Sequence, residues 1–426
     1  MQPESVIIQH ARLIEPGHEF HQQTCSIYIR NGFIEAVQKD AITESAELIL
    51  DGNGKNVSVG MFDLRCQLKD PGLEYQEDIQ SGAAAAAASG FTGLAVQPTT
   101  DPIVQSKSQV EYINKQAAGL IAEIIPIGAA THNFDSEDIN ELFDMRQAGA
   151  RAFSNGDHSF ASGGGLLRVL EYAGTLDTLI MSHAIDAHLA GEGMVNESST
   201  TVHTGLRQQA VVAEFAQIQK EIEVARYTGS AIHFSHITSA RSVEIIRKAK
   251  AEGLPVSCDV SIWHLVYTDA NTLSFDSNFK VLPPFRQEED REALIAGVND
   301  GTIDAVVSDH NPQNVENKLV EFDYASYGIA GLQTFYSVYV ERLSDSIDES
   351  TWWAATVSNP RKLLKLPVPS IRKGNSVNLR LEDPQATWVL DKSSNRSKSR
   401  NNPLWGNTLS GKCLFVMRGN HAERFD

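Results

Sequence analysis

Short apolar runs alternate with helical stretches through the middle of the chain, and this rhythm restricts the possible folds more than any other feature. Each run resembles a strand that helices cover on both faces. Between two of them, residues 242–251 form an amphipathic stretch with an apolar face from Val243 to Ala249, which Gly253 ends. Eight such βα units predict a (β/α)₈ TIM barrel over residues 60–369. The apolar runs are residues 61–64, 91–96, 122–127, 150–153, 179–181, 231–234, 255–260 and 303–307.

Both chain ends have another pattern, in which apolar and polar residues alternate. Residues 26–30 and 377–381 show the alternation that is typical of half-buried strands. We therefore predict a small β-sandwich module that residues 1–59 and 370–426 build together, beside the barrel. Residues 391–403 are rich in Ser, Asn, Lys and Arg and lack apolar anchors, so we expect an exposed loop there.

The overall charge argues against some classes of partner. The chain has a formal net charge of −18, and a field of this sign repels phosphate backbones, so we expect no nucleic-acid partner. No apolar stretch approaches the roughly 18 residues of a membrane span, so we expect no membrane association and a cytoplasmic location. The four cysteines lack CxxC spacing, which favours buried free thiols over disulfides or a zinc ribbon; they are Cys25, Cys66, Cys258 and Cys413.

Polar and titratable side chains follow the predicted strands at their carboxyl ends. In a (β/α)₈ barrel these ends meet at one mouth, where reactive groups lie. Histidines and an acid at successive strand ends suit a metal-dependent hydrolase, because imidazole and carboxylate are the usual ligands of zinc. The set consists of Arg65, Gln67, Gln97, Thr99, Thr131, His132, Ser154, Asn155, His183, His236, Asp309 and His310.

Several segments carry motifs that one known family shares. They are residues 70–92 (beginning DPG and ending GFT), 233–240 (HFSHITSA), 278–286 (NFKVLPPFR), 308–312 (SDHNP), 328–334 (GIAGLQT) and 397–401 (SKSRN). Together they resemble the complex-forming type of dihydroorotase along essentially the whole chain. The resemblance implies an amidohydrolase-type barrel. It also implies reversible hydrolysis of the cyclic amide of dihydroorotate by a metal-bound hydroxide, with an aspartate that shuttles the proton.

The positions that the resemblance assigns to the metals are largely replaced. Where the family has His-x-His, this chain has Arg65 and Gln67, and a guanidinium has no lone pair to give a metal. Ser154 and Asn155 stand near the place of a bridging carboxylate, and Asp157 would serve there only on a rebuilt loop. Matches remain for two histidine ligands and the catalytic aspartate, namely His183, His236 and Asp309. We expect no metal cofactor, and the alternative is one zinc on this remnant.

The positions that would bind the substrate carboxylate have changed as well. The resemblance assigns an arginine, two asparagines and a histidine to them, and this chain has Lys69, Thr99, Leu282 and Gln313 instead. Lys69 keeps the positive charge without the two-pronged geometry of arginine, and it is either an anion-attracting group or an ordinary surface lysine. Leu282 offers no polar group.

We interpret the chain as a catalytically inactive dihydroorotase homologue of pyrimidine biosynthesis that is retained as a folded partner. The resemblance implies aspartate carbamoyltransferase as that partner, and we expect a homo-oligomer. The alternative is an active cyclic-amide hydrolase that uses at most one metal. We expect Asp309 to pair with Arg65, because a buried carboxylate needs a partner. His183 and His236 are either remnant zinc ligands or hydrogen-bonded polar groups.

Overall fold

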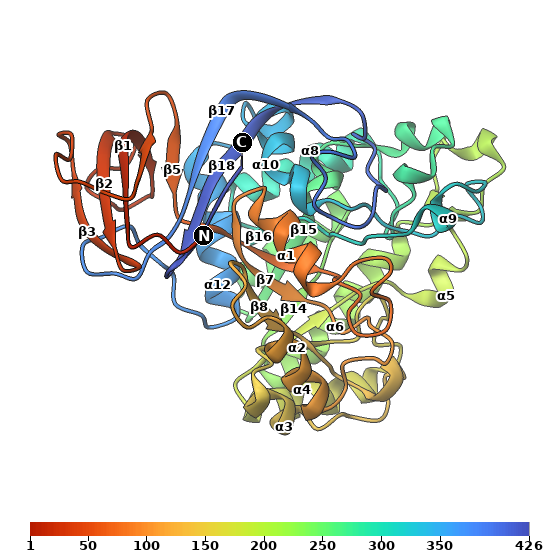
Figure 1. The fold of residues 1–426 in the computed structure, drawn as a ribbon. Helices are drawn as coiled ribbons and strands as arrows, with labels where there is room; N and C mark the ends of the chain where they lie inside the picture. The colour runs from red at the N-terminus through yellow and green to blue at the C-terminus, as the bar shows by residue number, and fades with distance from the viewer. Residues whose placement is uncertain (426) are drawn as a thin grey trace.

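A computed structural model describes residues 1–425, and its central feature is a closed ring of parallel strands (Figure 1). β6, β7 and β8 form one part of the ring, and β9, β10, β11, β14, β15 and β16 form the other. The ring closes where the backbone N–H of Gln67 donates to the carbonyl of His310 at 2.8 Å. The barrel strands are β6 (Met61–Cys66), β7 (Phe91–Val96), β8 (Glu123–Pro126), β9 (Gly128–Ala129), β10 (Ala152–Ser154), β11 (Leu179–Ser182), β14 (Ile232–Phe234), β15 (Val256–Ser261) and β16 (Ala305–Val307). β8 and β9 are separated by Ile127 alone and together occupy one place between β7 and β10, so the ring has eight places and the predicted (β/α)₈ fold is confirmed.

The strands are apolar on both faces because each face packs against something. Leu64, Ala95 and Met181 point into the barrel and form an interior cluster, whereas Phe91 and Leu94 belong to the outer core under the helices. The helices around the barrel are α1 (Ile79–Ala87), α2 (Lys107–Gln116), α3 (Leu142–Ala148), α4 (Gly163–Thr175), α6 (Val212–Thr228), α7 (Ala240–Ala251) and α8 (Glu288–Asn299).

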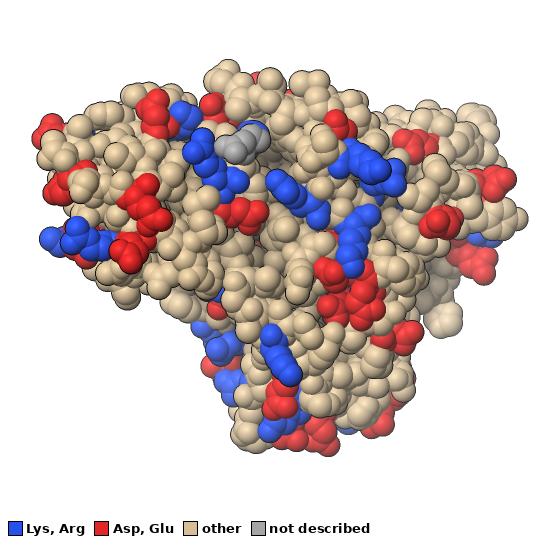
Figure 2. Space-filling model, viewed as in Figure 1, with Lys and Arg blue, Asp and Glu red and all other residues tan. Residues whose placement is uncertain are grey.

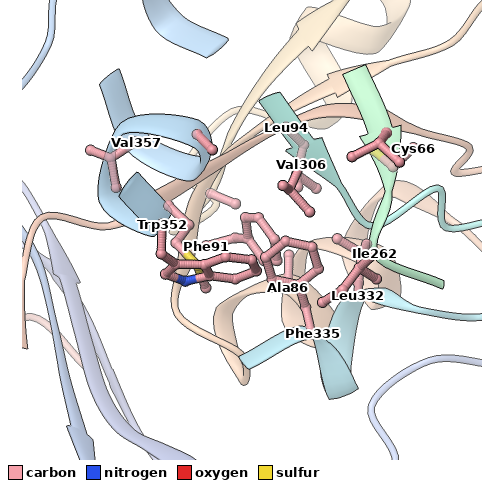
Figure 3. Close-up of a cluster of buried hydrophobic side chains, with 14 of the residues drawn as sticks. Cys66, Ala86, Phe91, Leu94, Ile262, Val306, Leu332, Phe335, Trp352 and Val357 are labelled. Carbon is pink, nitrogen blue, oxygen red and sulfur yellow. The ribbon is translucent and has the colours of Figure 1, made fainter. Parts of the chain in front are cut away.

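Aromatic side chains fill the outer core between the first two strands and the C-terminal helices (Figure 3). The ring centroids of Phe91 and Phe335 are 4.9 Å apart, and those of Phe335 and Trp352 are 5.1 Å apart. Burial of such rings is the main source of stability here. The short elements of this region and of the barrel loops are α5 (Ala187–Ala190), β12 (Val195–Asn196), β13 (Gln208–Gln209), α9 (Val315–Lys318), α10 (Phe335–Val338), α11 (Glu349–Trp353) and α12 (Asn359–Leu363).

The two chain ends share one eight-stranded sheet beside the barrel (Figure 1). β5 is the join between them, because it pairs with N-terminal β1 on one side and with C-terminal β17 on the other. This arrangement agrees with the predicted joint module. The strands are β1 (Ser5–Ile14), β2 (Thr24–Arg30), β3 (Phe33–Gln38), β4 (Leu48–Asp51), β5 (Asn56–Ser58), β17 (Asn378–Val389), β18 (Thr408–Arg418) and β19 (His421–Arg424).

Residues 391–403 form a loop, as their composition suggests, but only part of this loop is exposed. The segment lies on the barrel-mouth loops, and Ser399 and Asn401 are both only 3% exposed. The side-chain amide of Asn401 donates to the carbonyls of Asn311 (3.0 Å) and Gly328 (2.9 Å). Short polar side chains can therefore anchor a segment without apolar residues, by satisfying buried backbone groups.

Two expectations about composition can be compared with the structure directly. All four cysteines are free and buried, as expected from their spacing. Within residues 1–425, no helix combines the length and the apolar character that crossing a membrane requires.

Candidate active site

Arg65 lies at the centre of the barrel mouth, at the end of β6, and its side chain is 1% exposed. Its guanidinium forms an ion pair with Asp157, and its Nε lies 3.2 Å from Oδ1 of Asp309. The expected pairing with Asp309 is therefore present, and Asp157 joins it. One buried cation holds together two acids from opposite parts of the ring.

The charges of this cluster shift one another's ionisation. Burial alone would raise the pKa of Asp157, but the charge of Arg65, together with smaller contributions from His183, His236 and Lys69, outweighs burial and holds that pKa well below the usual range. Burial alone would likewise lower the pKa of Arg65, but Asp157 and Asp309 raise it. Burial raises the pKa of Asp309, although Arg65 opposes the rise. Arg65 therefore stays a cation that is matched to two acids.

The two histidines of the remnant site contact each other. Nδ1 of His183 lies 2.6 Å from Nε2 of His236, and Nδ1 of His236 lies 3.6 Å from Oδ1 of Asp309. Burial and the neighbouring His236 lower the pKa of His183 to about 3, and burial and Arg65 lower the pKa of His236 to about 3. Both rings are therefore neutral near pH 7. His236 (φ 42°) and Asp309 (φ 48°) have left-handed backbones, a strained conformation that is frequent at functional sites.

These residues do not fit a binuclear metal centre. The guanidinium of Arg65 occupies the contacts of both acids, and it would repel a dication. Gln67 turns its amide nitrogen, which is not a metal ligand, towards Oδ2 of Asp157 at 3.2 Å. Within residues 1–425, no three His, Cys, Asp or Glu side chains are grouped so that they could hold a metal ion.

Ser154 and Asn155 face away from this cluster. The side-chain oxygen of Asn155 accepts from the backbone N–H of Thr131 at 3.1 Å, and Ser154 Oγ accepts from the N–H of Gly156 at 3.0 Å. The next residues turn back at Gly156, which has a φ of +61°, and so bring Asp157 into the mouth. Asp157 was expected to serve only on a rebuilt loop, because a glycine turn carries no periodic signal in the sequence.

Two of the substrate-binding positions, Lys69 and Gln313, form internal hydrogen bonds. Lys69 is not a surface lysine: it is 7% exposed, its Nζ donates to Oε1 of Gln67 at 2.5 Å, and burial lowers its pKa to about 8. The amide nitrogen of Gln313 donates to Asn311 and to the carbonyl of Tyr327, both at 3.1 Å. The hydroxyl of Thr99 is buried and has no hydrogen-bond partner in the structure.

A cavity of about 550 Å³ lies beside Asp157 and His183, and its lining also includes Leu282 and Tyr327. Leu282 thus presents an apolar surface to the cavity where a polar group is expected for a bound carboxylate. The mouth retains space for a small molecule, but Lys69 and Gln313 are engaged by neighbouring side chains and Leu282 is apolar.

Known proteins with full-length similarity decide the family. A curated protein named dihydroorotase from Syntrophus aciditrophicus is 34% identical over 416 residues, covering 97% of each chain. Another, from Caldanaerobacter subterraneus subsp. tengcongensis, is 35% identical over 400 residues, covering 93% of this chain and 92% of the relative. The chain belongs to the dihydroorotase family. The family model described as Dihydro-orotase-like matches residues 54–242 of this dihydroorotase-family chain.

Solved structures show that this dihydroorotase-family chain has the expected architecture. L-Hydantoinase (dihydropyrimidinase) from Arthrobacter aurescens superposes with a TM-score of 0.86 at 22% identity, covering 99% of this chain and 97% of that one. A D-hydantoinase (dihydropyrimidinase) from Thermus sp. gives a TM-score of 0.81 at 17% identity, covering 99% of this chain and 95% of that one. The amidohydrolase-type barrel is therefore confirmed.

Sequence reasoning missed a buried network beneath the mouth of this dihydroorotase-family barrel. His233 Nε2 lies 2.8 Å from Oδ2 of Asp259, and His233 Nδ1 lies 2.8 Å from Ser257 Oγ. Oδ1 of Asp259 accepts from the backbone N–H of His236 at 2.6 Å. The network thereby fixes the strand end that presents His236. The pairing of adjacent strands β14 and β15 would have been needed to find it.

Proposed function

We propose that this chain is a dihydroorotase homologue of pyrimidine biosynthesis that does not catalyse the hydrolysis of dihydroorotate. In this proposal the chain forms a homo-oligomer in the cytoplasm and serves there as a folded partner of aspartate carbamoyltransferase. The observation that carries the proposal is the buried guanidinium of Arg65 between Asp157 and Asp309. It places a permanent protein cation among the acids that a metal would need.

The absence of a fitting metal site has a direct chemical consequence. Hydroxide is scarce at neutral pH unless a metal lowers the pKa of bound water towards ~7. The protein groups that remain do not replace this effect. His183 and His236, with pKa values of about 3, are weak bases, and Asp309 is engaged by Arg65. Nothing in the cluster therefore generates a strong nucleophile from water.

Substrate positioning supports the same proposal independently. Correct positioning is worth about 7–11 kcal/mol of a barrier, so its loss alone slows a reaction severely. Lys69 is tied to Gln67, Gln313 is tied to Asn311, and Leu282 is apolar. A restored metal would thus act on a substrate that the mouth does not hold.

The second candidate is a cyclic-amide hydrolase with one metal, which the closeness of His183, His236 and Asp309 favours. It requires Arg65 to leave Asp309. The two candidate functions differ in the zinc content of the purified protein and in its turnover of dihydroorotate. Elemental analysis and dihydroorotate turnover should be measured on this chain beside the Syntrophus aciditrophicus relative, prepared identically. We expect no stoichiometric zinc and no turnover; one zinc per chain with turnover would establish the hydrolase instead.

The partnership needs its own measurement. Aspartate carbamoyltransferase of the same organism should be mixed with the purified chain and analysed by size-exclusion chromatography with light scattering. We expect a complex with a fixed ratio of the two chains. Two separate peaks at micromolar concentrations would contradict the partner role and leave the prediction of inactivity intact.

A further inference from the structure

Two neighbouring loops, residues 269–279 and 315–327, expose an unusual share of the large apolar side chains. Six of the 15 exposed large apolar residues among residues 1–425 lie on them, so these side chains are concentrated rather than scattered. Leu319 and Tyr324 are the most exposed, at 81% each. We name the set the loop patch: Leu273, Phe275, Val315, Leu319, Val320 and Tyr324.

The two loops contact each other, and a buried side chain anchors them to the rest of the protein. Ser277 Oγ donates to the carbonyl of Lys318 at 2.5 Å, and Phe275 packs edge-on against Phe322 with ring centroids 6.4 Å apart. Phe322 is itself buried, in a cluster with Met194 and Val195. The loop patch is therefore a formed surface, which lowers the entropic cost of binding.

Lys318 on the second loop and Lys280, directly after the first loop, point inward. Nζ of Lys280 donates to the carbonyls of Phe322 (2.8 Å) and Asp323 (2.9 Å), and Nζ of Lys318 donates to those of Ser326 (2.9 Å) and Gly328 (3.2 Å). Lys280 is 3% exposed and Lys318 is 5% exposed. Both cations thus hold the loops together and contribute little charge to the outer surface.

The acids of these loops point outward. Asp276, Glu316, Glu321 and Asp323 are all exposed. Arg207, whose charge acts on Lys280, pairs with Glu192 at 3.5 Å. Figure 2 shows acidic side chains around the place that α9 occupies in Figure 1. The outer surface is therefore apolar with a negative rim.

We propose that the loop patch is a docking surface for a partner protein whose own face is apolar and rimmed by lysine or arginine. The inference rests on the proposed function, which supplies a protein partner. Charge complementarity selects this occupant: a symmetric contact with a second copy would bring two acidic rims together, which costs several kcal/mol in like-charge pairs. Phosphate backbones and anionic lipid headgroups are repelled for the same reason.

The test measures binding of aspartate carbamoyltransferase from the same organism to the full chain and to three variants. Leu319→Ser with Tyr324→Ser removes the two most exposed apolar side chains, and Glu321→Lys with Asp323→Lys reverses the rim. Tyr227→Ser is the matched control, since Tyr227 is 79% exposed on α6, outside the loop patch. We expect each patch variant to bind about tenfold more weakly or worse, and the control to bind as the unchanged chain does. Raising the salt concentration should weaken binding of the unchanged chain.

The outcomes separate this inference from the proposed function. Binding that both patch variants retain in full would overturn the loop patch while the partnership stands. Absence of binding by the unchanged chain would overturn both. Sedimentation of the chain alone supplies a further check: an assembly that Leu319→Ser with Tyr324→Ser dissociates would make a second copy the occupant and refute the basic partner. Thermal unfolding of Leu319→Ser with Tyr324→Ser and of the Tyr227→Ser control should match that of the unchanged chain, because these side chains are exposed.

Discussion

Replacing Arg65 with methionine removes the buried cation of the barrel mouth and leaves its two acids unpaired. The change keeps much of the side-chain volume, so the effect is mainly electrostatic. Breaking a buried ion pair on one side costs about 3–5 kcal/mol. Asp157 is 33% exposed and Asp309 is 16% exposed, so water relieves part of the penalty. We therefore expect a loss near the lower limit, about 3 kcal/mol near pH 7.

The pH dependence of this loss follows from the shifted pKa values. In the unchanged chain Arg65 holds the pKa of Asp157 below its usual range, so this pairing stabilises the fold above the unfolded pKa and is lost as the pH falls through the folded value. Without Arg65, burial raises the pKa of both acids above their unfolded values. The variant then gains stability as the pH falls, and its deficit should shrink between about pH 7 and pH 5.

Chemical denaturation at both pH values measures the effect, with Arg247→Met as the matched control. Arg247 pairs with Asp300 at 2.7 Å on the surface, where solvent screens the interaction. The denaturant concentration at the unfolding midpoint of Arg247→Met should therefore stay close to that of the unchanged chain. Adding Asp157→Asn and Asp309→Asn to Arg65→Met should restore part of the stability. A single Arg65→Met variant as stable as the unchanged chain at both pH values would refute the idea that Arg65 is the counter-ion of the mouth.

Three further predictions concern the metal, the ligands and the core. Chelation should leave cooperative thermal unfolding unchanged, because the apolar cores of the barrel carry its stability; a lower melting temperature after chelation would contradict this. Arg65→His with Gln67→His should bind zinc, with Asp157 as a ligand, yet give no dihydroorotate turnover. Adding Asn155→Asp should not raise the zinc content, since that side chain faces Thr131; a further zinc per chain would be inconsistent with this geometry. Phe335→Ala should cost about 3–5 kcal/mol in denaturant unfolding, because its ring packs between Phe91 and Trp352; a loss below about 1 kcal/mol would mean that the core refills the space.

The barrel could be predicted from sequence because its strands are buried on both faces and so produce uninterrupted apolar runs. The run at residues 91–96 coincides with β7, and Gly253 ends α7 at a left-handed backbone (φ +80°) as its position suggests. The domain boundaries remain predictions. The pairing of Arg65 with Asp309 was predictable as well, from the rule that a buried charge needs a partner.

The features of the site that could not be predicted from the sequence depend on turns and on polar contacts. Asp157 reaches the mouth through the turn at Gly156, and a single turn has no period to recognise. The burial of Lys69 depends on Gln67, which lies beside it only once β6 has formed. Asn401 is held by backbone carbonyls, and hydrogen bonds of this kind leave no trace in hydropathy.

The anchoring of residues 391–403 on the barrel mouth determines when this protein can be completed during synthesis. Ser399 donates to the carbonyl of Gln76, and Asn401 reaches Asn311, so contacts span more than 300 residues in the first case. The ribosome must therefore deliver nearly the whole chain before the mouth acquires its last supports. Until then the loops beside Asp309 lack the hydrogen bonds that Asn401 donates to Asn311 and Gly328.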